Sequence, residues 1–207
     1  MATAQNTCTV KIIRDCDPES PREWDNLGTM VCAHRRYNLG DEDGLAKALR
    51  VIYKHLSDKQ LDDMGFDADH VPDVEKALEK TGQAIVLPLY LYDHSGITMS
   101  TSPFSCRWDS GQVGFIYVTK EDVRNEYDWK RLTQERIQKI ETYLKGEVEV
   151  YDQYLTGDVW GFVSQEGDEE DSCWGFFGSD PLTNGILCHL TGAAAELVKT
   201  GRYEVQH

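Results

Sequence analysis

The residues best suited to chemistry lie together in the middle of the chain, over residues 93–112. Neutral hydrogen-bonding side chains are unusually dense there, and the apolar residues among them argue against a disordered tract. A connection of about twenty residues is far longer than a hairpin needs, and long ordered loops are more often functional. We therefore expect an ordered polar loop that forms the wall of the main binding pocket.

The second half of this loop carries the richest set of ligand-binding groups. Arg107 is the only cation between Lys80 and Lys120, and Trp108 beside it offers a stacking face. A cation, an indole and small hydrogen-bond donors together suit a nucleotide or a sugar phosphate. The alternative is that Trp108 belongs to the core and that Arg107 pairs with Asp109. The loop residues predicted to bind the ligand are His94, Ser95, Ser105, Arg107, Trp108, Asp109, Ser110 and Gln112.

A second group of cations lies near the start of the chain. His34, Arg35 and Arg36 form its most basic spot, and Tyr37 follows them. Guanidinium groups bind phosphate in a fork and stack on rings, so the arginine pair fits an anion clamp. It fits equally well a counter-charge for the acidic C-terminal region. The two groups of cations can lie together within one fold or across a dimer interface. The sequence is therefore also compatible with a homo-oligomer.

Histidine chemistry is a further candidate in the central loop. Asp93, His94 and Ser95 are the three residue types of a hydrolytic triad, but triads converge from distant positions and rarely form between sequence neighbours. His94 can act as a general base if the fold brings Asp109 or Asp25 to it. If the protein is an enzyme, we expect a hydrolase that uses His94, Asp93 and Asp109. The simpler alternative is a loop histidine that hydrogen-bonds within its own turn.

The chain carries none of the common short catalytic motifs. We find no P-loop, dinucleotide glycine motif, zinc-protease motif, EF-hand or serine-hydrolase elbow. The six histidines are scattered, and no two share a metal-ligand spacing with a carboxylate on a predicted helix. We predict no cofactor and no metal site, and we favour a binding protein over an enzyme.

The central loop is positioned by two apolar runs, at 85–92 and 113–118, whose β-branched and aromatic residues predict strands. A second pair of runs, at 157–164 and 172–177, predicts a β-hairpin. Alternation places four hairpin aromatics on a hydrophobic face: Trp160, Phe162, Trp174 and Phe176. Helical spacing and caps predict helices at 41–56, 73–80, 119–127 and 132–146, the last ending at Gly146.

This mixture of hairpins and isolated helices predicts the α+β class. We expect a single mainly antiparallel sheet with flanking helices, in one domain over residues 1–207. Hydrophobic residues make up 40% of the chain, and no apolar run approaches the roughly eighteen residues of a membrane-spanning helix. The first seven residues lack the basic and apolar parts of a signal peptide, so we expect a cytoplasmic protein without membrane contact. The six cysteines form no C-x-x-C pair, which favours buried free thiols.

The net charge of −15 is concentrated in the C-terminal part, from about residue 146. Between Lys145 and Lys199 there are eleven acidic residues and no Lys or Arg. Nucleic-acid sites need clustered cations, so we exclude binding of a nucleic-acid backbone there. The acidity fits a mimic of DNA or an inhibitor that binds a basic partner such as a host defence protein. It fits equally a soluble, self-repelling surface without a partner.

Several sequence blocks resemble a family of small uncharacterised proteins encoded by bacteriophages and other mobile elements of bacteria. The blocks are DNLGTM at 25–30 with His34 and LGD at 39–41, LYLYDHSG at 89–96, WDSGQVGF at 108–115, YDQYLTG at 151–157 and DSCWGF at 171–176. They frame most of the chain up to about Gly178. The chain departs from the family pattern at Arg107, where a proline is common, and at Trp160, where a tyrosine is expected. The resemblance implies an accessory phage protein that acts in the cytoplasm of the bacterial host.

Together these observations favour a phage-encoded anti-defence protein that sequesters a small nucleotide-derived immune signal, of the cyclic nucleotide or ADP-ribose type. The first alternative is an acidic inhibitor or DNA mimic of a host defence complex. The second is a hydrolase that uses His94.

Overall fold

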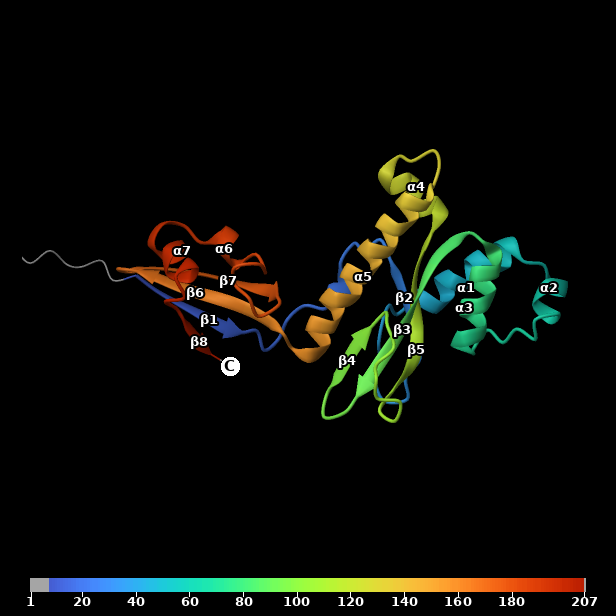
Figure 1. The fold of residues 1–207 in the computed structure, drawn as a ribbon, viewed down its shortest axis with the longest axis horizontal. Coiled ribbons are helices and arrows are strands. Elements are labelled where there is room, and N and C mark those ends of the chain that lie inside the picture. Colours follow the sequence, from blue (N-terminus) through green and yellow to red (C-terminus); the bar gives the residue numbers. More distant parts are fainter. Residues whose placement is uncertain (1–7, 207) are drawn as a thin grey trace, which may run out of the picture. The chain divides into compact units, whose positions relative to one another are not determined.

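The computed structural model describes residues 8–206, which divide into two compact units (Figure 1). Unit 2 spans Trp24–Asp152, and unit 1 combines the segments before and after it. The α+β class is confirmed, but the prediction of a single sheet is wrong, because each unit has a four-stranded sheet of its own. That residues 1–207 form one domain stays a prediction. The expectation for the first seven residues lies outside the described part of the chain.

The sheet of unit 2 contains the two predicted central strands. Its order is β2 (Thr29–Cys32), β5 (Ser110–Thr119), β3 (Ala84–Asp93) and β4 (Ile97–Ser100), and all neighbours are antiparallel. Pro88 lies in β3 beyond the end of β4, which pairs only with the last four residues of β3. At Pro88 the strand therefore has a neighbour on one side only, which is where a sheet accepts a proline.

The prediction of one continuous polar loop over residues 93–112 is wrong in one respect. Residues 97–100 form strand β4, so the segment is a tight β3–β4 hairpin followed by a loop at 101–109. Met99 anchors the strand, since its side chain is buried in the core. The carboxylate of Asp152 accepts hydrogen bonds from Thr98 Oγ1 at 2.7 Å and from the Met99 backbone N–H at 2.6 Å.

Helices cover both faces of this sheet (Figure 1). α1 (Gly44–His55) and α3 (Val71–Thr81) lie on one face, and α5 (Gln134–Thr156) lies on the other. α2 (Asp58–Asp62) connects α1 and α3, and α4 (Lys120–Tyr127) follows β5. The predictions of α1, α3 and α4 are confirmed. Thr119 caps α4 as expected, because its hydroxyl accepts a hydrogen bond from the Asp122 N–H at 3.0 Å.

Helix α5 runs through Gly146, so the prediction that it ends there is wrong. Four buried residues, Ile140, Leu144, Val148 and Tyr151, recur at helical spacing on both sides of the glycine. Packing of this stripe outweighs the penalty of about 1 kcal/mol for glycine inside a helix. The helix ends at Thr156, where Gly157 adopts a positive φ of 67°.

The sheet of unit 1 has the order β7 (Glu169–Phe177), β6 (Val159–Glu166), β1 (Cys8–Arg14) and β8 (Glu204–Gln206). β8 is parallel to β1, and the other pairs are antiparallel. A short 3₁₀ helix, η1 (Pro21–Glu23), also belongs to this unit. α6 (Ile186–His189) and α7 (Gly192–Lys199) contribute to a core that includes Ile12 and Phe162.

The predicted β6–β7 hairpin is confirmed, but one of its four aromatic residues lies on the face opposite to the predicted one. Trp160, Phe162 and Phe176 are buried, whereas Trp174 is 46% exposed. Trp160 pairs with Phe176 and Phe162 pairs with Cys173, so two residues of β7 oppose Gly161 alone. This β-bulge turns Trp174 to the other face of the sheet. A Cβ added at Gly161 would collide with the indole of Trp174, so the glycine makes room for the ring.

All six cysteines lie within residues 8–206 and are free thiols. Cys16 and Cys188 are exposed and the other four are half-buried. The prediction of free thiols is confirmed, and the prediction of full burial is wrong.

Candidate functional site

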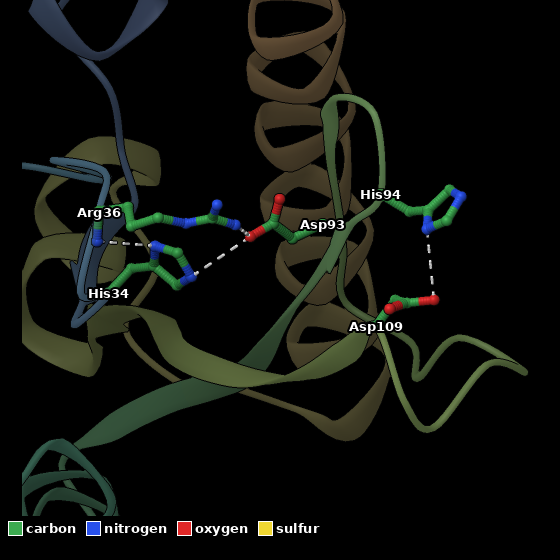
Figure 2. A network of polar contacts seen from close by, with 5 residues as sticks. All are labelled: His34, Arg36, Asp93, His94 and Asp109. Carbon is green, nitrogen blue, oxygen red and sulfur yellow. Dashed lines mark hydrogen bonds and ion pairs between the residues drawn. The ribbon is translucent and has the colours of Figure 1, made fainter.

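The candidate site lies at the end of β3 in unit 2, where Asp93 and His94 follow each other. Their side chains point in opposite directions, as neighbours in an extended strand do (Figure 2). Asp93 is directed toward His34 and Arg36 in the loop after β2, and His94 is directed toward Asp109, the last loop residue before β5. The strand end therefore separates two polar clusters, one on each side.

Asp93 holds the first cluster together. Its Oδ2 accepts a hydrogen bond from Nη2 of Arg36 and lies 4.0 Å from Nε2 of His34. The ring of His34 stacks on Tyr37 with 5.0 Å between centroids and 12° between planes. The hydrogen bond to Asp93 and its negative charge raise the pKa of Arg36. Arg36 is therefore the counter-ion of Asp93, which weakens its predicted role as part of an anion clamp.

Arg35 is placed differently from Arg36. It lines an open hollow of about 830 Å³ formed by residues 32–42, together with His34, Tyr37, Asn38 and Glu42. Arg35 is exposed and has no ion-pair partner among residues 8–206. Helix α5 anchors this loop, because the Gly40 N–H donates a hydrogen bond to the hydroxyl of Tyr151 on α5 at 3.1 Å. The hollow thus combines a free cation with an amide and a stacked ring pair on an anchored loop.

The second cluster joins His94 to Asp109. Nδ1 of His94 lies 3.5 Å from Oδ2 of Asp109, and the histidine side chain is 63% exposed. The same carboxylate oxygen accepts a hydrogen bond from the Cys106 thiol at 3.5 Å, and the Ser110 hydroxyl donates to the Cys106 carbonyl. Of the three carboxylates proposed for His94, the structure brings Asp109 to it and turns Asp93 away, and Asp25 forms no ion pair with it in the described chain. A carboxylate beside an imidazole can orient the ring and stabilise its protonated form.

Four of the remaining residues of the predicted site are exposed: Ser95, Ser105, Arg107 and Trp108. Trp108 is 95% exposed, so the alternative that it belongs to the core is wrong. Arg107 is exposed and forms no ion pair with Asp109 in the described chain. Ser95, with a positive φ of 59°, and Ser105 are also exposed.

Gln112 faces another element. Its Nε2 donates to Oε2 of Glu75 on α3 at 2.7 Å and to the Gly114 carbonyl at 3.2 Å. Burial raises the pKa of Glu75, and the hydrogen bond from Gln112 partly opposes this shift. Both amide hydrogens thus have protein acceptors, so Gln112 is poorly placed to bind a ligand.

Tyr37, Asn38 and Glu42 line the hollow and were not among the predicted ligand residues. The available signal was the position of Tyr37 and Asn38 between an arginine pair and the turn at Gly40, which has a positive φ of 76°, with Glu42 directly after this turn. Loops that close over the end of a strand in this way are frequent binding surfaces.

Within residues 8–206, no group of three or more His, Cys, Asp or Glu side chains is arranged to hold a metal ion. Every helix in this range is too short or too polar to cross a membrane. Comparisons with protein-family models, with curated proteins and with solved structures found no match for this chain.

Proposed function

We propose that this protein binds a small nucleotide-derived ligand in the hollow formed by residues 32–42 and sequesters it. In the phage setting that the sequence blocks imply, the ligand would be an immune signal of the cyclic nucleotide or ADP-ribose type. The observation that carries the proposal is the grouping of Arg35, the His34–Tyr37 ring pair and Asn38 around one hollow.

The lining of the hollow matches the parts of a nucleotide. Its volume of about 830 Å³ falls in the range of small-molecule sites, which is about 300–1,000 Å³. The guanidinium of Arg35 suits a phosphate, because it presents several N–H donors in one plane. The Asn38 amide can recognise a base edge, and the Glu42 carboxylate can accept hydrogen bonds from ribose hydroxyls.

Trp108 supplies a separate stacking surface in the same unit. Its indole is 95% exposed and lies next to Arg107 in the sequence. Stacking of a base on an aromatic side chain is worth about 1–3 kcal/mol. Whether the loop at 101–109 contacts the same ligand as Arg35 is decided by comparing variants at the two positions.

The test is titration calorimetry against a panel of cyclic nucleotides and ADP-ribose derivatives. Arg35→Ala should weaken binding by about tenfold or more, since it removes a charge-assisted contact to phosphate. Arg50→Ala, an exposed arginine on α1 of the same unit, removes the same charge and should have little effect. Recovery of intact ligand after heat denaturation would support sequestration. Binding that is unaffected by Arg35→Ala would overturn the assignment to this hollow, and a panel without any binder would overturn the function.

A hydrolase is the second candidate, and the His94–Asp109 pair favours it. Asp109 approaches Nδ1, so Nε2 of the ring is the nitrogen left to accept a proton from water. Recovery of altered ligand in the same panel would indicate this activity. His94→Ala should then abolish turnover and preserve binding. Turnover that survives in His94→Ala would exclude His94 as the base.

A further inference from the structure

Unit 1 has a hollow of its own, of about 240 Å³, at the turn end of its sheet. Its apolar side is formed by Cys8, Leu190 and Ala194. Its polar side is formed by Glu169, Glu170 and Asp171 of β7, together with Glu166 at the end of β6. An apolar wall beside several carboxylates is the environment that a long cationic side chain prefers, because its stem is apolar and its head is charged.

A buried hydroxyl opens into the same hollow. Ser164 is only 9% exposed, lines the hollow and pairs in the sheet with Val10 and Asp171. Its hydroxyl has no hydrogen-bond partner among residues 8–206, and its oxygen is not fully enclosed by protein atoms. The oxygen is therefore open to the hollow, where a donor that enters can bond to it.

Three of the carboxylates around the hollow have no ionic partner in the described chain. Glu169, Glu170 and Asp171 form no ion pair within residues 8–206, and no Lys or Arg occurs between Lys145 and Lys199. Burial and the charge of Glu166 raise the pKa of the Cys8 thiol, so the hollow favours the neutral thiol. These conditions repel anions and attract a cation.

β7 is also the outer strand of its sheet. Residues 169–172 are exposed, and no strand of the described chain pairs with their free side. An exposed strand edge presents unpaired backbone N–H and C=O groups, to which an extended peptide can add as a further strand.

We propose that this edge binds an extended basic peptide segment, whose backbone pairs with β7 and whose Lys or Arg side chain fills the hollow. The stem of that side chain lies on Leu190 and Ala194, and its head donates hydrogen bonds to Ser164 and to Glu169 or Asp171. Charge complementarity selects a basic partner over an acidic one or a second copy of this acidic edge. The site lies in unit 1 and is independent of the nucleotide site proposed in unit 2.

The probe is a synthetic hexapeptide of alternating lysine and valine, titrated into the full chain at low salt. Two control peptides accompany it: one with glutamate in place of lysine, and one with N-methylated backbone amides at alternate positions, which keeps the charge but blocks strand pairing. The expected result is binding of the unmodified lysine peptide alone.

Three variants locate the site. Glu169→Gln combined with Asp171→Asn should weaken binding of the lysine peptide by about tenfold, because two charges at the hollow are removed. Glu204→Gln, in the exposed strand at the opposite edge of the sheet, is the matched control and should have little effect. Ser164→Ala should weaken binding severalfold without lowering the melting temperature, since its hydroxyl has no bond to lose.

Three results would overturn the proposal. Equal weakening by Glu204→Gln would show diffuse attraction to an acidic surface. Equal binding of the N-methylated peptide would exclude strand pairing. Absence of binding would mean that the acidic residues only protect the edge against aggregation. None of these results bears on the panel that tests unit 2.

Discussion

Glu75 shows how the fold changes the chemistry of a single carboxylate. It is half-buried on α3 and accepts a hydrogen bond from Gln112 at 2.7 Å. Burial raises its pKa above the ordinary value despite that hydrogen bond. The native state therefore keeps the proton to a higher pH than the unfolded chain does. By linkage, the stability that this proton contributes is present at acidic pH and is lost as the pH rises through the native-state pKa.

Glu75→Gln should remove this pH dependence, because glutamine is neutral and can still accept the hydrogen bond from Gln112. We expect the variant to be more stable than the wild type near neutral pH, and the difference to disappear below the ordinary pKa of glutamate. Urea unfolding at acidic and neutral pH measures it. Glu149→Gln, at an exposed position of α5, is the control. A stability difference that is the same at both pH values would contradict the assignment.

The sequence located the candidate site only in part. Composition pointed to residues 93–112 and to the arginines at 35 and 36, and both segments contribute to the polar clusters in Figure 2. The pairing of Gln112 with Glu75 joins residues 37 positions apart, so no local pattern could reveal it. Arg36 pairs with Asp93, whereas Arg35 lines the hollow. This difference depends on where β3 ends in the fold, which is likewise a tertiary feature.

Among the elements, helix α5 offers a direct test of why it continues through Gly146. The glycine does not have a positive φ, and a Cβ added there would meet nothing within 4 Å. Gly146→Ala should therefore stabilise the protein by about 1 kcal/mol, the difference in helix propensity between the two residues. Equilibrium unfolding in urea measures the gain. Gly28→Ala is the opposite case, since its Cβ would lie 2.6 Å from Leu144, and it should destabilise.

The β6–β7 hairpin gives a second prediction at this scale. Phe162 is 1% exposed, and its truncation to alanine should cost about 3–5 kcal/mol. Trp174 is 46% exposed above Gly161, so Trp174→Ala should cost about 1 kcal/mol. Urea unfolding of both variants compares the two losses. Similar losses would show that Trp174 is covered in solution and would contradict its exposed position above Gly161.

Local sequence patterns predicted the helices and strands themselves better than they predicted which strands pair with each other. Caps and helical spacing were sufficient for α1, α3 and α4, and alternation was sufficient for the hairpin. Alternation failed at Trp174 because a single bulged residue reverses the faces of a strand. The two sheets were missed because β1 pairs with β6, about 150 residues later in the chain, and nothing local specifies that choice.

At the scale of the whole molecule, the charge is distributed unevenly between the two units. Unit 1 has 13 acidic and 5 basic residues, whereas the larger unit 2 has 23 and 16. The two units have nearly equal net charge, but unit 1 carries it on far fewer residues. Self-repulsion therefore destabilises unit 1 more, and dissolved salt should relieve it more there.

This difference predicts a local response to salt that hydrogen exchange can follow. As sodium chloride is raised from low to physiological concentration, peptides from β6 and β7 should gain more protection than peptides from β3 and β5, because exchange reports the stability of each region separately. Glu169→Gln combined with Glu170→Gln should reduce the gain in unit 1 and leave unit 2 unchanged. These acids have no ion pair in the described chain, so removing them breaks no attraction. Equal gains of protection in both units would show that the charge repulsion acts across the whole molecule. The acidic hairpin would then be no more destabilised by repulsion than the rest of the surface.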